Sequence, residues 1–238
     1  MIPPLAVVFD LDGTLIDSRG DIVASLNHAL LKKGRKALPA QLIVRFIGDG
    51  ARTLISRAAD LPEASAEVDE LLELFLTYYT AHPIDFTRWM EGAPDVLDAL
   101  SAMPDMALAI CTNKARRATD VVLAALGIGD RLRATFAGGD LPEKKPSPEP
   151  LLHLARLMGV PPGAVVMVGD GPQDVESARR AGMRSVAVEG GLCSLDRVIA
   201  AGPDVLLHSL VELPEIIGRW RDATARMTTP RRPAPILP

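Results

Sequence analysis

Acidic residues follow the first apolar run of the chain, in the stretch FDLDGTLIDS at residues 9–18. Asp10, Asp12 and Asp17 lie within eight positions and are interleaved with glycine. Asp and Gly are depleted in strands, so a buried strand over residues 5–9 ends here. Carboxylates this close together repel one another unless a cation lies among them. The spacing therefore predicts a cation site directly after the first strand.

Two sequence patterns alternate along the rest of the chain. Helical periodicity with little strand character runs from about residue 21 to residue 82, in four segments. Beyond about residue 92, short β-branched runs alternate with helices, three of which end at glycine. This alternation, with continuously apolar strands, is typical of a parallel sheet covered on both faces. The expected strands are residues 5–9, 106–111, 134–138, 165–170, 185–189 and 204–208.

These patterns predict an α/β fold, a doubly wound, Rossmann-like parallel-sheet core with an inserted helical bundle. The first strand belongs to the same sheet as the later ones, so the bundle is an insertion. We expect the core to comprise residues 1–18 and 84–227, and the inserted helical domain to comprise residues 19–83. Residues 228–238 contain four prolines and two arginines, which predicts a disordered tail.

Chemically active side chains follow several of the predicted strands or lie in the loops beyond them. In open parallel sheets, ligands bind at the carboxyl ends of the strands. Carboxylates, a hydroxyl and ammonium groups therefore converge on one edge from positions as far apart as 10 and 170. The residues concerned are Asp10, Asp12, Thr112, Asn113, Lys114, Lys144, Lys145, Asp170 and Asp174.

Four motifs contain most of these residues: FDLDGTLIDS, CTNK, KKPSPEP and GDGPQD. Each alone is a modest signal, but four in this order, each at a strand end or in the loop that follows, are specific. In these motifs the chain resembles the haloacid dehalogenase-like phosphohydrolases. The resemblance runs from the first strand to about Glu215 and covers nearly all of the globular part.

The resemblance implies a phosphatase that works through an aspartyl-phosphate. Asp10 would be the nucleophile that attacks phosphorus, which divides one difficult step into two. Asp12 would protonate the leaving alcohol and then deprotonate the water that hydrolyses the intermediate. Thr112 and the backbone N–H of Asn113 would hold phosphate oxygens, and Lys145 would neutralise charge in the transition state.

The resemblance also implies Mg²⁺, held by Asp10, Asp170 and the backbone carbonyl of Asp12, with Asp174 in support. Mg²⁺ prefers a few protein oxygens together with substrate phosphate and water. The charge of the site agrees, because four ionised carboxylates and the one ammonium of Lys145 leave three negative charges before a phosphate enters. Mg²⁺ and a proton on Asp12 would bring the empty site to neutrality.

Several of these residues also have ordinary structural explanations. Asp10 and Asp12 could merely solvate a strand end. Thr112 could cap the helix that follows it, and Asp174 could be an early-helix acid favoured by the helix dipole. Lys145 is preferred to its neighbouring lysine only because it precedes a proline, as in the family pattern.

The inserted helices resemble the cap that closes over this family's active site and selects the leaving group. Within them, residues 46–55 are similar to the GxG turn of phosphoglycolate phosphatases. Gly48 and Gly50 permit a tight turn, and amides of the next helix with Arg52 could bind a carboxylate. Alternatively, the turn only joins two helices and Arg52 faces solvent, because Asp49 would repel a carboxylate.

We therefore expect Mg²⁺-dependent hydrolysis of a small phosphorylated metabolite, with 2-phosphoglycolate as the first candidate. A phosphosugar mutase similar to β-phosphoglucomutase is an alternative, since it would share Asp10 and Asp12 but transfer the phosphoryl group to a sugar. A sugar phosphate, a nucleotide or pyrophosphate also remains open as the substrate. A non-enzymatic binding module should lack one of Asp10, Asp12, Lys145 and Asp170, and all four are present.

Composition limits the partners. The 238 residues have a formal net charge of −4, which argues against a nucleic-acid or anionic-membrane partner. The N-terminus does not read as a signal peptide, and no window reaches the roughly 18 apolar residues that span a bilayer. Cys111 and Cys193 lack the spacing of metal ligands, so a cytoplasmic protein is expected. The sequence does not distinguish a monomer from a homodimer.

Overall fold

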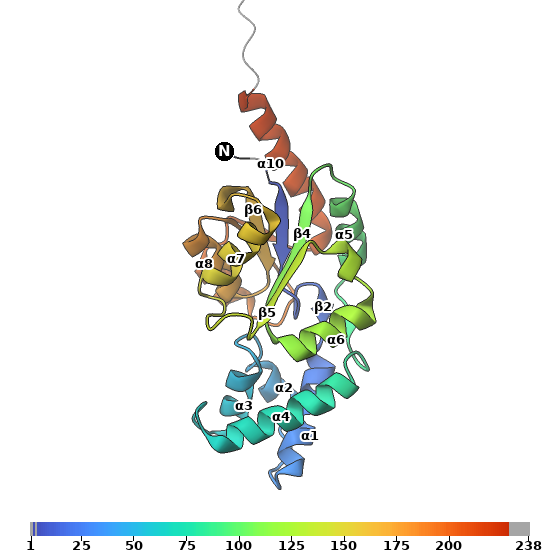
Figure 1. The fold of residues 1–238 in the computed structure, drawn as a ribbon, viewed down its shortest axis with the longest axis vertical. Coiled ribbons are helices and arrows are strands. Elements are labelled where there is room, and N and C mark those ends of the chain that lie inside the picture. Colours follow the sequence, from blue (N-terminus) through green and yellow to red (C-terminus); the bar gives the residue numbers. More distant parts are fainter. Residues whose placement is uncertain (1, 3, 229–238) are drawn as a thin grey trace, which may run out of the picture.

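A six-stranded parallel sheet forms the centre of the computed structural model (Figure 1), which describes residues 2 and 4–228, the last five by their backbone alone. The strand order is β5-β4-β1-β6-β7-β8, which confirms the predicted α/β fold. The strands are β1 (Ala6–Phe9), β4 (Ala107–Ala115), β5 (Ala134–Gly138), β6 (Val165–Gly169), β7 (Arg184–Val188) and β8 (Val205–Leu207).

β1 lies between β4 and β6, and its position decides where the active groups meet. Phe9, the last residue of β1, is paired with Ile110 of β4 and Val168 of β6. The residues that follow β1 and β6 and the last residues of β4 therefore emerge side by side at one edge. The chain order also reverses across β1, and open α/β sheets bind ligands at such a switch point.

Both faces of the sheet are covered by apolar packing. On β1, Val7 and Phe9 belong to one buried cluster, whereas Ala6 and Val8 belong to another. Burial on both faces explains why the strand sequence is uninterruptedly apolar. The covering helices are α5 (Ala93–Ser101), α6 (Arg116–Leu126), α7 (Glu149–Met158), α8 (Pro172–Ala181), α9 (Leu195–Ala201) and α10 (Leu213–Thr228), with short 3₁₀ turns at Gly129–Arg131, Pro162–Ala164 and Leu210–Glu212.

Four helices occupy the chain between two short strands, β2 (Ile16–Asp17) and β3 (Arg88–Trp89), and lie together at one end of the molecule (Figure 1). We call them the helical insertion. β2 precedes the insertion and β3 follows it, and their antiparallel pairing holds the two connecting segments together. Two residues are too few to show a periodicity, so the sequence patterns did not predict this ladder. The four helices are α1 (Arg19–Lys32), α2 (Ala40–Val44), α3 (Ala51–Ala59) and α4 (Ala66–Ala81).

Asp21 fixes the base of the helical insertion. Its buried carboxylate accepts the N–H of Phe86 at 3.0 Å and the N–H of Thr87 at 2.7 Å. The hydroxyl of Thr87 donates to the same carboxylate at 2.6 Å. One side chain at the start of α1 therefore accepts hydrogen bonds from the backbone where the chain returns from the insertion, 65 residues later.

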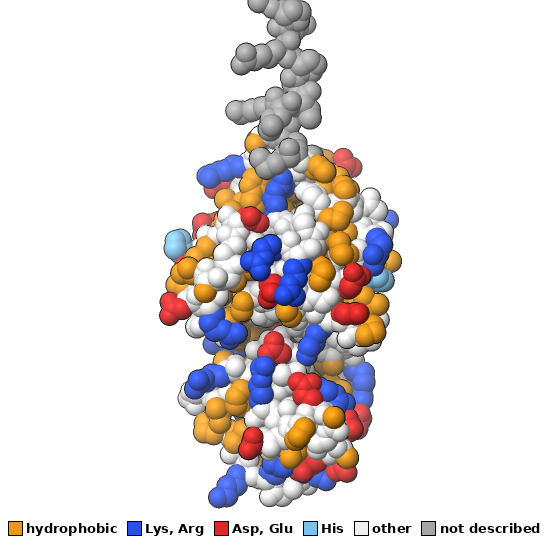
Figure 2. All heavy atoms as spheres, turned by 90° about the vertical axis from the view of Figure 1, so that its left-hand side faces the viewer, with side chains coloured by type: hydrophobic (Ala, Val, Ile, Leu, Met, Phe, Trp, Pro, Cys, Tyr) orange, Lys and Arg blue, Asp and Glu red, His pale blue; other side chains and the backbone are white. Residues whose placement is uncertain are grey.

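The outer surface carries mixed charge. On the face shown in Figure 2, basic, acidic and apolar side chains are interspersed over both the sheet domain and the helical insertion. Within the described ranges, no helix is both long enough and apolar enough to cross a membrane. Of the predicted tail, Thr228 is the last residue of α10, and the rest lies outside the described residues.

Candidate active site

The chain turns sharply after β1 and leaves two aspartates at the sheet edge. The N–H of Asp10 donates to the carbonyl of Val168 at 2.8 Å, which fixes Asp10 beside the end of β6. Gly13 has φ +92°, and a Cβ there would lie 2.4 Å from Oδ2 of Asp170. Glycine is therefore required both by the backbone and by the close approach of that carboxylate. Asp12 lies between these two positions with its side chain 13% exposed.

A buried ammonium group is held among the carboxylates. The Nζ of Lys145 lies 2.9 Å from Oδ1 of Asp10 and 2.6 Å from Oδ1 of Asp174. Burial alone would lower the pKa of Lys145, but the two carboxylates hold it above its usual range. Lys144 points elsewhere, since its Nζ donates to the carbonyl of Asp49 at 2.6 Å. The structure thus places Lys145 rather than Lys144 at Asp10.

Three buried carboxylates could hold a metal ion. Oxygens of Asp10, Asp170 and Asp174 lie within 4.8 Å of one another. Burial raises the pKa of Asp10 to about 7, against the opposing charge of Lys145, and raises that of Asp170 to about 6. A divalent cation would relieve this destabilisation, and an all-oxygen set suits Mg²⁺. Asp174 already accepts from Lys145 and from the N–H of Gly171 at 3.1 Å, so it fits a supporting position.

The end of β4 brings Thr112 and Asn113 into the same cavity as Asp10 and Asp12. Oγ1 of Thr112 accepts the N–H of Lys114 at 3.1 Å, which leaves its proton available to donate. The following helix, α6, has no side-chain cap at its start, so the capping alternative for Thr112 is not observed.

The side chain of Asn113 ties three segments together. Its amide nitrogen donates to the carbonyl of Gly48 at 3.1 Å and to that of Lys145 at 3.0 Å. Its Oδ1 accepts the N–H of Lys145 at 3.0 Å. Both hydrogens of the side-chain amide are therefore used within the protein, so the side chain of Asn113 has none left to donate to a ligand.

Lys114 occupies the site although the sequence prediction gave it no role. Its Nζ lies 3.0 and 3.2 Å from the two carboxylate oxygens of Asp12, and Ser18 donates its hydroxyl to Asp12 at 2.6 Å. The same Nζ lies 4.3 Å from the ring centroid of Tyr79 on α4. Burial alone would lower the pKa of Lys114, but Asp12 holds it above its usual range. A lysine at the end of a central, buried strand is rare, which was the signal in CTNK.

The turn at residues 48–50 lies over the sheet edge, but Arg52 does not. Gly48 and Gly50 line the cavity, and the carbonyl of Gly48 accepts from Asn113. The guanidinium of Arg52 instead donates to Asp69 at 2.5 Å, on the exposed side of α4. The structure therefore does not bring Arg52 to the cavity, because an acid on the neighbouring helix pairs with it.

Comparisons with known proteins agree with this arrangement. A family model described as haloacid dehalogenase-like hydrolase matches residues 7–188. The chain is 36% identical to a phosphoglycolate phosphatase of Neisseria meningitidis over 217 residues, covering 88% of this chain and 92% of that protein. It is 31% identical to an N-acetylmuramic acid 6-phosphate phosphatase of Pseudomonas aeruginosa, covering 90% of this chain and 95% of that protein. A crystal structure of a predicted phosphoglycolate phosphatase from Haemophilus somnus superimposes with a TM-score of 0.82 at 28% identity, covering 91% of this chain and 99% of the other.

Proposed function

This chain belongs to the haloacid dehalogenase-like hydrolases and is a phosphatase of phosphate monoesters, and from that premise we propose that it converts 2-phosphoglycolate to glycolate and phosphate. The observation that supports the reaction most directly is the ammonium of Lys145, buried between Asp10 and Asp174. A fixed cation beside a nucleophilic carboxylate suits a phosphate dianion. The choice of substrate follows the names of the relatives that are about 35% identical.

Two aspartates would carry the covalent steps. Asp10 attacks phosphorus as the bond to the leaving oxygen breaks, and Asp12 gives that oxygen its proton. Water then attacks the aspartyl-phosphate, Asp12 takes the proton of the water, and phosphate leaves as Asp10 is restored. The hydrogen bond from Ser18 and the ion pair with Lys114 orient the Asp12 carboxylate for both transfers.

The remaining groups would hold the phosphate. The hydroxyl of Thr112 and the backbone N–H of Asn113 donate to its oxygens, and Lys145 balances its charge. Mg²⁺ bound by Asp10, Asp170 and the backbone carbonyl of Asp12 would neutralise further charge on the phosphoryl group. We also propose that the helical insertion acts as a cap that excludes water from the aspartyl-phosphate until the leaving group has departed.

A sugar phosphate is the second candidate substrate. An open cleft of about 670 Å³ adjoins Asp12 and Asp170 and carries Arg45 and Arg197 on its walls. A leaving group larger than glycolate would fit this cleft. The relative from Pseudomonas aeruginosa, named for N-acetylmuramic acid 6-phosphate, motivates the same candidate.

The test is phosphate release with Mg²⁺ or with EDTA over a substrate panel. The panel contains 2-phosphoglycolate, N-acetylmuramic acid 6-phosphate, β-glucose 1-phosphate, a nucleoside monophosphate, pyrophosphate and an aryl phosphate. We expect kcat/KM to favour 2-phosphoglycolate by at least about tenfold, or about 1.4 kcal/mol of transition-state binding. A preference for either sugar phosphate would replace 2-phosphoglycolate. Conversion of glucose 1-phosphate to another phosphosugar would indicate a mutase.

A further inference from the structure

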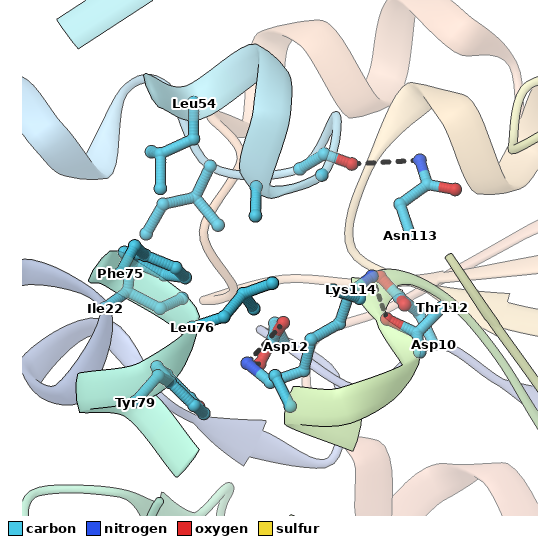
Figure 3. A pocket seen from close by; sticks show the side chains of 16 residues that line it. Asp10, Asp12, Ile22, Leu54, Phe75, Leu76, Tyr79, Thr112, Asn113 and Lys114 are labelled. Carbon is cyan, nitrogen blue, oxygen red and sulfur yellow. Dashed lines mark hydrogen bonds and ion pairs between the residues drawn. The ribbon is translucent and has the colours of Figure 1, made fainter. Parts of the chain in front are cut away.

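A small cavity of about 50 Å³ lies between the sheet edge and the helical insertion, and we call it the chamber (Figure 3). Its two sides differ in chemistry. The sheet side presents polar groups, including Asp10, Asp12 and Lys114. The insertion side is formed mainly by apolar side chains, namely Ile22, Ile47, Leu54, Phe75 and Leu76.

Lys114 is the one cation among the described residues that line the chamber. Figure 3 shows it reaching to Asp12 on the side where α4 carries Leu76 and Tyr79. The ammonium has three hydrogen-bond donors, and its observed contacts are the two Asp12 oxygens and the ring of Tyr79. An anion arriving from the insertion side would meet this ammonium while Asp12 still holds it.

The three cations that the sequence prediction considered for phosphate or substrate binding have other partners. Lys145 lies between Asp10 and Asp174, and Lys144 donates to a backbone carbonyl of the insertion. Arg52, the cation that the sequence favoured for substrate selection, pairs with an acid on the outer side of α4. None of the three lines the chamber.

A charged leaving group would depend on Lys114 for its stability in the chamber. Asp10 and Asp12 repel any second anion, and an apolar wall cannot solvate one. Apolar surroundings also strengthen the attraction between an ammonium and an anion relative to water. Because a water molecule needs about 10–15 Å³ of such space, the chamber suits a small acid rather than a sugar.

From this geometry we infer that Lys114 determines substrate specificity by binding a carboxylate on the leaving group. The inference rests on the proposed phosphatase function and adds to it the residue that recognises the leaving group. Lys114 replaces Arg52 in that role. The apolar wall of Phe75 and Leu76 limits the length of the acid that fits.

The experiment compares two substrates of nearly the same shape, 2-phosphoglycolate and its neutral amide, 2-phosphoglycolamide. Their kcat/KM values are measured with Mg²⁺ for the wild type, Lys114→Met, Lys114→Arg and Lys144→Met. Met keeps the length of the lysine without its charge. Lys144→Met is the matched control, because Lys144 is a neighbouring lysine that contacts the insertion but does not line the chamber. Circular dichroism and thermal unfolding verify that each variant folds.

We expect the wild type to favour the carboxylate over the amide by about tenfold or more in kcat/KM. In Lys114→Met this ratio should decrease to about one, whereas Lys114→Arg and Lys144→Met should retain most of it. An equal loss on both substrates in Lys114→Met would overturn the inference and leave Lys114 as a positioning residue for Asp12.

The wild type alone provides a second test that needs no folded variant. Glycolate should inhibit the hydrolysis of an aryl phosphate at least about tenfold more strongly than glycolamide does. A wild-type substrate ratio or inhibition ratio near one would overturn the inference while the phosphatase function stands. Absence of Mg²⁺-dependent release from every phosphate monoester would instead refute the function itself.

Discussion

The charged residues are buried on the sheet side of the chamber and exposed on the side of the helical insertion. At the sheet edge, Asp10 and Lys145 are buried and engage each other inside the protein. On the helical insertion, charged groups pair with one another on the outside, as Arg35 does with Glu67, and leave an apolar surface toward the chamber. We therefore expect Asp10 and Asp12 to act on any phosphate monoester, whereas Lys114 and the apolar wall of the insertion should decide which leaving group fits.

The two sides are joined by polar contacts from core side chains to backbone carbonyls of the turn at residues 48–50. Asn113 donates to the carbonyl of Gly48, and Lys144 donates to that of Asp49. Contacts of this kind hold the turn whatever side chains the insertion carries. Changes at Asp10 or Asp12 should end the chemistry, whereas changes at Lys114 or in the insertion should alter specificity, affinity or stability.

The largest effect should come from Asp10→Asn. An amide cannot form the aspartyl-phosphate, so kcat should decrease by at least about 10³-fold. The fold should survive, because the substitution removes a buried charge whose pKa burial raises to about 7. Phosphate release and the urea unfolding midpoint measure the two effects. The control is Asp17→Asn, which alters an exposed pair with Arg19 and should leave kcat within about twofold. Near-normal turnover by Asp10→Asn would remove Asp10 from the nucleophilic role.

The next effect concerns the base of the insertion. Asp21→Ala leaves the buried N–H groups of Phe86 and Thr87 without their acceptor, which should destabilise the protein by about 3 kcal/mol. Urea unfolding gives the loss, and Asp21→Asn, which keeps one acceptor oxygen, should lose less. Asp69→Ala, at an exposed position of α4, is the surface control, with an expected loss below about 1 kcal/mol. Equal losses for Asp21→Ala and Asp69→Ala would show that the insertion is held by other contacts.

Asp21 also shows which contacts could not be predicted from the sequence. Periodicity and strand-end chemistry predicted the sheet, the four inserted helices and the convergence of carboxylates and lysines at one edge, because these follow from short-range patterns and parallel topology. The choice of Lys145 over Lys144 came from the family resemblance alone. The partners of Asp21 lie 65 residues away, so its position at a helix start gave no sign of them. Arg52 was assigned to the leaving group because the sequence does not show that Asp69 on another helix pairs with it.

Lys114 was overlooked for a related reason. The motif that contains it assigns functions to the two residues before it, and those assignments left the lysine unexplained. Its role depends on which residues face it across the chamber. Those residues, Tyr79 and the apolar side chains of α4, come from a helix that sequence patterns could detect but could not orient.

The next prediction concerns how the stabilisation of the protein by Mg²⁺ depends on pH. Burial raises the folded-state pKa of Asp10 to about 7 and that of Asp170 to about 6, from 3.8. Without metal, the folded state then binds more protons than the unfolded state between about pH 4 and 7. The contribution of these groups to stability is therefore lost as pH rises through this window. Mg²⁺ must displace the same protons, so its stabilising effect should increase from pH 5 to pH 8.

Thermal unfolding in Mg²⁺ and in EDTA measures this effect. At a Mg²⁺ concentration about 100 times the dissociation constant, stabilisation should reach about 2.7 kcal/mol at pH 8. That corresponds to a rise in Tm of roughly 5–10 °C for a chain of this length. At pH 5 the rise should be smaller, and Asp170→Asn should lose most of it at both pH values. An equal rise at pH 5 and pH 8 would mean that the carboxylates do not need to lose protons for Mg²⁺ to bind.

The smallest effect is expected from Gly50→Ala, which alters the contact between the two sides of the chamber. Gly34→Ala is its matched control. Gly50 has φ +89°, and a Cβ there would lie 2.9 Å from the carbonyl oxygen of Asn113, whereas Gly34 has φ +71° with open space around it. Both alanine variants should lose about 1 kcal/mol of stability from backbone strain. Only Gly50→Ala must also move the turn away from the sheet edge, so KM for 2-phosphoglycolate should rise about tenfold while kcat changes less. Steady-state kinetics of both variants provide the comparison. Equal kinetics would mean that the position of the turn does not affect the leaving group, and selection would then rest on the side chains that line the chamber.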